Sequence, residues 1–306
     1  MKLKYLLPIC TAVLLTACSQ NDGEALATRK AILEVNPQVA ATRAVITGIY
    51  LPYDSSIGVC LLDTDDQPYA DDSRNLRVNN STGRWVFDKR VELTEAKGRV
   101  TAYYPYNENG TGDSLYIRCG NTIGIQQEYL YTPEAVEVDA DHPAATLQMH
   151  FALARITLSL SSMQADEHFS VNSILLANIR KNQDENEAPA LNTEGFMNRF
   201  DGEIMKFFDD QAISAYGLQL NLTTTPTDVD VLVLPAELKK DYVQLTIGLA
   251  SGEELTTTIP ATTWEKGKQY IYPIRIHQNK LYIGEYQIVP RGEAGEQNVF
   301  VPYSNE

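Results

Sequence analysis

The thiol of Cys18 is the side chain whose neighbours define a chemistry most clearly in this sequence. It directly follows Leu15-Thr16-Ala17, and these follow Lys2, Lys4 and a mainly apolar stretch over residues 5–15. A charged start, a short apolar stretch and small residues before a cleavage point make a secretory signal. The stretch is too short for a permanent spanning helix, which needs roughly 20 apolar residues. The sequence therefore predicts export across a membrane.

The order Leu15-Thr16-Ala17-Cys18 is similar to a bacterial lipobox, in which signal peptidase cuts before the cysteine and lipid is attached to its thiol. This predicts a signal peptide over residues 1–17 and a mature chain that begins at a lipidated Cys18. Each buried methylene of an acyl chain adds about 0.8 kcal/mol, so several chains on one cysteine make a stable membrane anchor. A plain secretory peptide with an incidental cysteine is the alternative.

Two further thiols remain in the mature chain, because Cys10 leaves with the signal. Cys60 and Cys119 both lie in apolar, strand-like surroundings. An exported protein can join two such residues in a disulfide, and buried free cysteines are an equal alternative. Neither cysteine has the spacing of a metal site, so we expect no bound metal and no cofactor.

Motifs for catalysis are lacking in the sequence. The four histidines have no partner at a known spacing, and there is no Gly-x-Ser-x-Gly, no His-Glu-x-x-His and no glycine-rich phosphate loop. The acidic run over residues 63–72 lacks the glycine of a calcium loop, and Arg74 stands where the closing glutamate belongs. We expect a protein that is not an enzyme.

The charge of the chain excludes one class of partner. The formal net charge is -15, and the loss of Lys2 and Lys4 with the signal takes it from -15 to -17. Nucleic acids and anionic headgroups are bound by positive patches, which so acidic a chain is poorly equipped to supply. We therefore expect no nucleic-acid partner.

Short runs rich in Val, Ile, Thr and Tyr, separated by Asn, Asp, Gly and Pro, recur from residue 44 onward. Such runs predict strands, and the expected strands are Ala44–Leu51, Ile57–Leu62, Arg84–Phe87, Gly98–Tyr103, Leu115–Arg118, Ala145–Leu160, Asn172–Ala177, Gly217–Thr223, Asp228–Leu234, Tyr242–Leu249, Glu254–Ile259, Lys268–Ile276 and Asn279–Ile288. Many short strands with turn residues between them favour antiparallel β-sandwiches.

Other stretches depart from the strand pattern. Residues 203–210 and 236–241 are expected to form short helices, and the polar residues 63–80 and 181–198 are expected to form loops. A break near residues 139–144 predicts two domains, an N-terminal β-sandwich over 44–145 and a C-terminal β-sandwich over 146–306. The expected fold class is therefore all-β, with short helices in loops.

A separate strand is expected before the first domain, over residues 31–39. One face of this strand would carry Ala31, Leu33, Val35, Pro37 and Val39. Nine residues at about 3.3 Å each span roughly 30 Å. The strand is followed by Arg43 among small residues, and Arg29 stands in a similar setting before it. An exposed arginine in a link of small residues suits an arginine-specific protease; a flexible tether is the alternative.

Several motifs occur in a fixed order along the chain. They are the lipobox, Thr42-Arg43-Ala44, Val100-Thr101-Ala102-Tyr103-Tyr104-Pro105-Tyr106, Leu147-Gln148-Met149-His150-Phe151-Ala152-Leu153-Ala154-Arg155-Ile156, Val231-Leu232-Val233-Leu234-Pro235 and Trp264-Glu265-Lys266-Gly267-Lys268-Gln269-Tyr270-Ile271-Tyr272. In this order and spacing they resemble the fimbrillins, the type V pilus subunits of Bacteroides-type bacteria. Many fimbrillins have a tryptophan soon after the last strand, where this chain has residues 288–292 instead.

The resemblance implies a fold and an assembly mechanism. The fold would be two transthyretin-like β-sandwich domains in tandem. The precursor would be anchored in the outer membrane by its lipid, and an arginine-specific protease would remove residues 18–43 by cutting after Arg43, with Arg29 as the alternative. The strand of an incoming pilin subunit would then fill the exposed groove, giving a homo- or heteropolymer in a cell-surface fimbrium that supports adhesion.

The expected donor of that strand is the C-terminal segment. Val299, Val301 and Tyr303 alternate there after residues 291–296. A terminal strand folded into its own sheet is the alternative. The role also stays open at this point among a stalk subunit, a tip or anchor subunit, and a surface lipoprotein that binds a glycan or another ligand.

Overall fold

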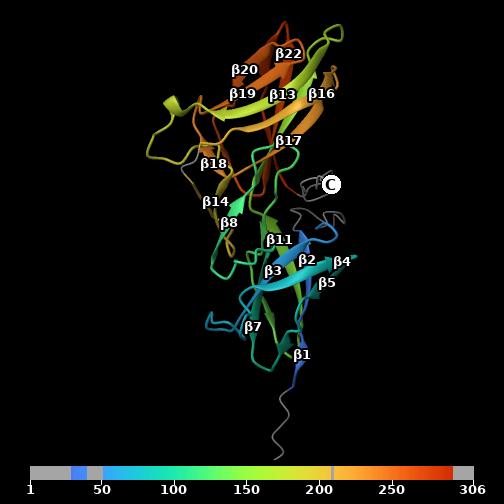
Figure 1. Cartoon of the computed structure of the whole chain (residues 1–306), viewed down its shortest axis with the longest axis vertical. Helices are drawn as coiled ribbons and strands as arrows, with labels where there is room; N and C mark the ends of the chain where they lie inside the picture. Colours follow the sequence, from blue (N-terminus) through green and yellow to red (C-terminus); the bar gives the residue numbers. More distant parts are fainter. Residues whose placement is uncertain (1–28, 40–50, 208–209, 292–306) are drawn as a thin grey trace, which may run out of the picture.

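Strands recur along the whole length of the chain that the structure describes, because apolar side chains recur there at every second position. The computed structural model describes residues 29–39, 51–207 and 210–291, and these residues build two lobes stacked along the long axis (Figure 1). Within these ranges the one helical element is a 3₁₀ turn over Arg180–Asn182. None of the helices in the described ranges has the length and apolar character needed to cross a membrane.

The first lobe is built on one large sheet. Its path is β2 (Glu34–Val39), β11 (Ala144–Phe151), β9 (Leu130–Tyr131), β7 (Gly98–Tyr104), β3 (Ser56–Leu62), β4 (Leu76–Ser81) and β5 (Arg84–Phe87), and β10 (Val136–Val138) pairs with β7. A small sheet joins β1 (Ala31–Ile32) to β6 (Glu92–Leu93). The end strands β2 and β5 approach each other, so the large sheet curls around its apolar face.

The second lobe is a pair of sheets facing each other. One contains β17 (Thr227–Val233), β12 (Ala154–Ser162), β22 (Lys268–His277), β23 (Lys280–Ile283) and β24 (Gln287–Pro290). The other contains β16 (Ile213–Leu222), β13 (Phe169–Asn178), β19 (Val243–Leu249) and β20 (Glu254–Thr258), and β18 (Ala236–Leu238) pairs with β21 (Thr262–Trp264). Buried side chains of both sheets form one hydrophobic cluster around Trp264.

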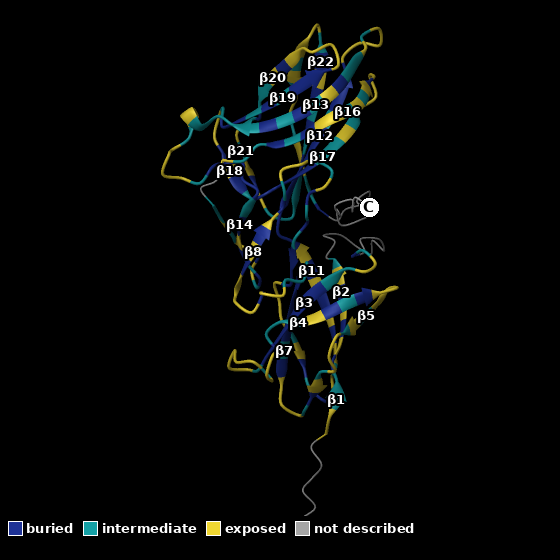
Figure 2. Cartoon of the chain, in the orientation of Figure 1, coloured by how far each residue is buried: buried dark blue, intermediate teal, exposed yellow. Residues whose placement is uncertain are grey.

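A further sheet lies at the junction of the lobes and draws on both halves of the chain. It consists of β15 (Ile204–Lys206), β14 (Glu194–Asn198) and β8 (Ser114–Arg118). β8 comes from the part expected to form the N-terminal sandwich, and β14 from the part expected to form the C-terminal one. The buried residues of this region form a cluster of their own, with Tyr103 and Leu153 among its members. Figure 2 shows buried residues in dark blue between the two lobes.

The two predicted helices are wrong. Residues 204–206 are strand β15, paired with β14, and residues 236–238 are strand β18, paired with β21. In β18 the side chains of Ala236 and Leu238 are buried, whereas β15 gains a backbone ladder with β14 while Met205 stays exposed. In both places a partner strand from elsewhere in the fold outweighs weak local propensity.

Two predicted loops contain strands. The stretch 63–80 includes most of β4, and the stretch 181–198 includes β14. Both strands carry polar residues on one face, and β4 even buries Asn80, whose side-chain nitrogen donates to the carbonyl oxygens of Leu51 and Pro52. A polar residue satisfied in this way breaks the apolar pattern that predicts strands. The expected strand Ala44–Leu51 lies, except for Leu51, outside the described residues.

Candidate functional site

The N-terminal strand β2 forms one end of the large first-lobe sheet and pairs with a single neighbour there, β11. The pairing is parallel and runs from Glu34 opposite Ala144 to Val39 opposite Met149. The structure confirms the strand predicted over residues 31–39, in two pieces, β1 and β2. Between them, the amide nitrogen of Leu33 donates to the carbonyl oxygen of Val91 at 3.0 Å. The segment is thus bound on both sides of Leu33.

Alternation places one face of β2 in the first-lobe core. Leu33 is 1% exposed and Val35 is 7% exposed, and Pro37 is also buried, whereas Glu34 and Asn36 face solvent. Burial of a leucine or valine side chain contributes about 1.5–3 kcal/mol each. The predicted apolar face of this strand is therefore confirmed at its three central positions.

The partner strand β11 supplies the matching apolar face. Its residues Ala145, Leu147 and Met149 are buried in the same cluster as Leu33 and Val35. In the ladder, Val35 lies opposite Ala145. Without β2, these side chains and one edge of β11 would face solvent. The groove formed by the edge and buried face of β11 is the feature of the first lobe that an added strand could occupy.

Pro37 fits the edge position of β2. Proline lacks an amide hydrogen, and in sheets it is confined to edge strands, strand starts and bulges. Pro37 lies opposite Leu147 in the ladder. A polar contact also ties the solvent face of the two strands, since Gln148 Nε2 donates to Gln38 Oε1 at 3.2 Å.

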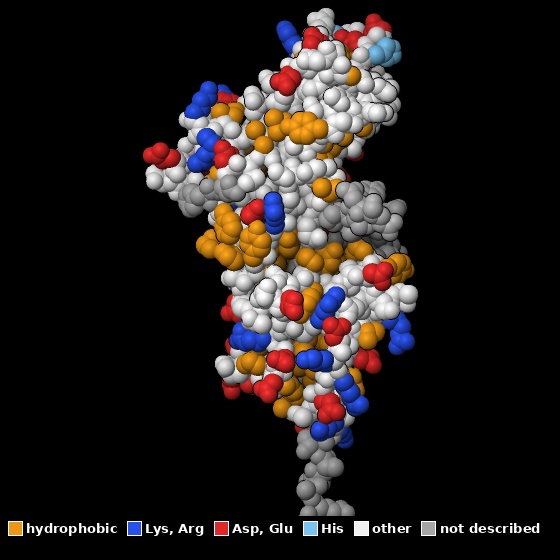
Figure 3. Space-filling view, viewed as in Figure 1, with side chains coloured by type: hydrophobic (Ala, Val, Ile, Leu, Met, Phe, Trp, Pro, Cys, Tyr) orange, Lys and Arg blue, Asp and Glu red, His pale blue; other side chains and the backbone are white. Residues whose placement is uncertain are grey.

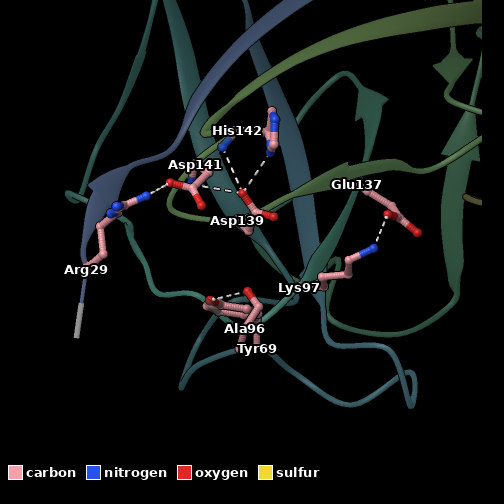
Figure 4. Close-up of polar contacts among 8 residues, drawn as sticks. All are labelled: Arg29, Tyr69, Ala96, Lys97, Glu137, Asp139, Asp141 and His142. Atoms are coloured by element: carbon pink, nitrogen blue, oxygen red, sulfur yellow. Dashed lines mark hydrogen bonds and ion pairs between the residues drawn. The ribbon is translucent and has the colours of Figure 1, made fainter. Parts of the chain in front are cut away.

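Ion pairs hold the segment just before β1. The Arg29 guanidinium pairs with the Asp141 carboxylate (Figure 4). Lys30 Nζ donates to Glu92 Oε2 at 3.0 Å. The hydrogen bond from Lys30 lowers the pKa of the Glu92 carboxyl. All four side chains are exposed, and exposed pairs contribute about 0–1 kcal/mol each. These contacts fix the direction of the segment more than its stability.

The loop that carries Asp141 is ordered by Asp139. One oxygen of Asp139 accepts hydrogen bonds from the amide nitrogens of Asp141 and His142, at 2.9 and 2.7 Å. Figure 4 shows this arrangement beside Arg29. The backbone donors lower the pKa of the Asp139 carboxyl, with that of His142 contributing most. Asp139 therefore positions the partner of Arg29.

Most of the residues predicted from the sequence as sites lie outside the described part of the chain. These are the lipidation residue Cys18, the cleavage residue Arg43, and the donor-strand residues Val299, Val301 and Tyr303. Arg29, the alternative cleavage residue, is described and precedes β1. The pairing of β2 with β11 and the Arg29–Asp141 contact were not predicted. The alternation of apolar and polar residues in β11 indicates a half-buried strand, but this local pattern does not indicate which strand pairs with it.

Cys60 and Cys119 are both buried free thiols. In the structure they therefore form no disulfide with each other. Each has a different neighbour. Arg199 Nη2 lies 3.5 Å from Cys60 Sγ, and Cys119 Sγ lies 3.7 Å from the carbonyl oxygen of Gly120. Burial raises the pKa of both thiols. In the described ranges no group of three or more His, Cys, Asp or Glu side chains is arranged to hold a metal ion.

Comparison with known proteins gives one family and one fold. A family model described as fimbrillin-like matches residues 42–290. Among solved structures, a candidate cell adhesion protein from Bacteroides ovatus superposes with a TM-score of 0.63 at 16% identity, covering 86% of this chain and 98% of that chain. A second candidate cell adhesion protein, from Bacteroides uniformis, gives a TM-score of 0.61 at 14% identity, with 85% and 98% covered.

A third similar structure is the tip fimbrial protein Mfa3 from Porphyromonas gingivalis with a C-terminal truncation. It gives a TM-score of 0.51 at 10% identity and covers 85% of this chain and 99% of that chain. Identities this low establish a shared fold and nothing finer. No curated protein matches the chain.

Proposed function

Because the chain belongs to the fimbrillin-like family, we propose that it is a structural subunit of a cell-surface pilus. It is exported as a lipoprotein through Cys18, cleaved after an arginine, and polymerised by strand exchange with other pilin subunits. The pilus supports adhesion. This is a structural role that needs no catalytic residue, and we propose none.

One observation carries the proposal, namely that β2 is an end strand of the large first-lobe sheet. It pairs with β11 alone, and it buries Leu33, Val35 and Pro37 over the core. Loss of β2 would leave the β11 edge and its apolar neighbours exposed, which is an aggregation hazard unless another strand takes the place. An extended strand with apolar residues at every second position can do so by β-augmentation.

The position of the two arginines favours Arg43 over Arg29 as the cleavage residue. Arg43 comes four residues after the end of β2, so a cut there separates β2 from the body of the protein. Arg29 comes before β1, so a cut there leaves β1 and β2 joined to the body, and its guanidinium is already paired with Asp141. The family match begins at residue 42, which leaves β2 outside it.

The incoming strand comes from the C-terminal segment of another subunit in this proposal. Val299, Val301 and Tyr303 alternate with other residues, as the side chains of a strand must to enter pockets on one face. Leu33, Val35 and Pro37 show the same alternation in β2 and the residue before it. The donor residues thus offer the pattern that the groove already accommodates.

The test is N-terminal sequencing of protein sheared from the native cell surface, with the membrane fraction beside it. A new N-terminus at Ala44 on high-molecular-weight material is expected, and Arg43→Ala should abolish both the new terminus and the polymer. Arg29→Ala is the matched control and should leave both unchanged. If all of the protein keeps an acylated Cys18 and stays with the membrane, the stalk role is wrong and an anchor role replaces it.

A further inference from the structure

Two pockets lie side by side on the first lobe and share residues. One has a volume of about 330 Å³ and the other about 260 Å³. Tyr106 and Glu108 line both. The two pockets therefore adjoin at Tyr106 and Glu108, and together they are called the groove below. Small-molecule sites usually begin near about 300 Å³, a size that the first pocket reaches alone and the second only together with the first.

Aromatic side chains dominate the larger pocket. Tyr103, Tyr106, Tyr116 and Tyr129 line it together with Pro105. These tyrosines come from β7, the segment after β7, β8 and the segment before β9. Tyr103 is fixed, because its buried hydroxyl donates to Asn75 Oδ1 at 2.6 Å. Tyr129 is fixed as well, because its hydroxyl bonds both backbone groups of Arg118. The pocket wall is therefore held in place before any ligand arrives.

The aromatic surface continues beyond the pocket across the junction sheet. Tyr116 is 45% exposed, and its ring lies 6.2 Å from that of Phe196 and stacks at 6.0 Å on that of Phe207. Figure 3 shows hydrophobic side chains gathered over β8 and β14. The Tyr116 hydroxyl donates to Glu194 Oε2 at 2.8 Å, which fixes the ring. Tyr116 thus joins the pocket to an exposed platform of rings.

Acidic and basic residues line each pocket of the groove in equal numbers. The larger pocket has one acidic residue, Glu108, and one basic residue, Arg118. The smaller pocket has three acidic and three basic residues, which are Asp72, Asp88, Glu108, Arg74, Arg77 and Lys89. An anionic or cationic ligand needs an excess of opposite charge in its site. This lining has no such excess and favours an uncharged ligand.

The groove still offers hydrogen-bonding groups. Throughout the ranges that the structure describes, the Tyr106 hydroxyl and the Glu108 carboxylate have no hydrogen-bond partner, and Glu108 is exposed. The Arg77 guanidinium lies 5.3 Å from the centre of the Tyr106 ring and steadies it. A ligand here meets aromatic faces, a hydroxyl and a carboxylate in one place.

We propose that this groove binds a neutral oligosaccharide, with one sugar ring in each pocket and the linkage beside Tyr106 and Glu108. A sugar ring has a face of C–H groups, which are attracted to the negative face of an aromatic ring. Its rim carries hydroxyls that both donate and accept, which suits a lining with acidic and basic groups in equal number. The groove is separate from the β2–β11 site, and the proposal does not depend on pilus assembly.

The probes are linear tri- to pentasaccharides of glucose, galactose and mannose in α and β linkage. Saturation-transfer NMR on the full chain in detergent identifies the binder, and calorimetry gives its Kd. Glu108→Gln and Tyr106→Ala should each weaken binding about tenfold or more, since few groups carry most of such affinity. Tyr216→Ala is the control, because Tyr216 is an exposed tyrosine on β16, in the other lobe.

Glu108→Gln keeps the test valid if Tyr106→Ala disturbs the fold, because the Glu108 side chain is exposed. Binding of a neutral sugar that both groove variants weaken and the control leaves unchanged supports the proposal. Absence of binding by every neutral probe at several millimolar overturns it. So does binding confined to sialylated or sulfated sugars, or binding that Tyr216→Ala weakens as much as the groove variants do.

Discussion

Val35 lies directly opposite Ala145 in a parallel ladder, and both side chains are buried in the first-lobe core. This pair joins the N-terminal strand β2 to the strand β11. Since β2 has no other strand partner in the described sheet, it is held by its ladder with β11 and by the burial of side chains such as Val35 in the first-lobe core. Val35 is therefore the position at which the docking of β2 can be tested.

Val35→Asp should undock the strand, because an unpaired carboxylate in the core costs several kcal/mol. The edge strand can leave the core and return the charge to water, so the body of the protein should stay folded. Limited proteolysis should cut within residues 29–39 about tenfold faster in this variant. Asn36→Asp is the matched control, since Asn36 is the exposed neighbour on the same strand. Equal cutting rates in the two variants would contradict the docking described here.

The buried ion pair between Glu128 and Arg291 gives a second prediction. Arg291 Nη2 lies 2.6 Å from Glu128 Oε2, both side chains are 0% exposed, and the guanidinium stacks 3.7 Å from the centre of the Phe151 ring. Glu128→Gln should cost about 3–5 kcal/mol in urea unfolding, because it removes a buried carboxylate that faces a buried guanidinium. Replacing both partners by methionine should recover part of that loss.

The control for this pair is the exposed pair of Lys97 and Glu137, whose atoms are 3.0 Å apart (Figure 4). Glu137→Gln should change the free energy of unfolding by less than about 1 kcal/mol. A similar loss for the buried and the exposed variant would show that burial does not set the strength of the Glu128–Arg291 contact.

Arg199 supplies a third prediction at the junction of the lobes. Its Nη1 donates to the carbonyl oxygens of Arg74 and Gly110, each at 2.9 Å, and the side chain is buried. Arg199→Lys keeps the charge but loses the planar guanidinium, whose Nη1 donates to both carbonyls. Each buried carbonyl left without a donor costs about 1–3 kcal/mol, so thermal and urea unfolding should both show a clear loss. Arg84→Lys, at an exposed position, should be nearly neutral.

The lowered pKa of Lys206 gives a prediction of how the free energy of unfolding varies with pH. Burial lowers its pKa to about 8 in the folded protein, against about 10.4 in an unfolded chain. Between these values the unfolded chain binds more protons, so the free energy of unfolding rises with pH. Below pH 8 both states are protonated, and the burial penalty is present in full. Lys206→Met should stabilise the protein below pH 8, and this advantage should shrink as the pH rises toward 10.

The measurement for Lys206 is urea unfolding of the wild type and the methionine variant at several pH values from 6 to 10. Comparison of the two proteins removes contributions that they share. Tyr103 and Tyr129 are one such contribution, because burial raises the pKa of each to about 12 and stability then falls above pH 10. A difference between the proteins that stays constant with pH would contradict a buried Lys206.

Local sequence pattern was sufficient for the fold class and for the faces of single strands. The alternation over residues 31–39 placed Leu33, Val35 and Pro37 on one face, and all three are buried. Side chains alternate with period two along any strand, so a short stretch carries this information by itself. The order of motifs also indicated the fimbrillin resemblance, which the family match over residues 42–290 bears out.

Only the tertiary structure decided which segments meet. Residues 204–206 became a strand because β14 offered them a partner, although their own pattern favoured a helix. Tyr103, Tyr106, Tyr116 and Tyr129 are scattered in sequence, and the fold gathers them around one pocket. The sequence pattern also did not indicate that β11 is the parallel partner of β2. Alternation fixes the face a side chain occupies, but burial summed over distant segments selects the strand that lies against it.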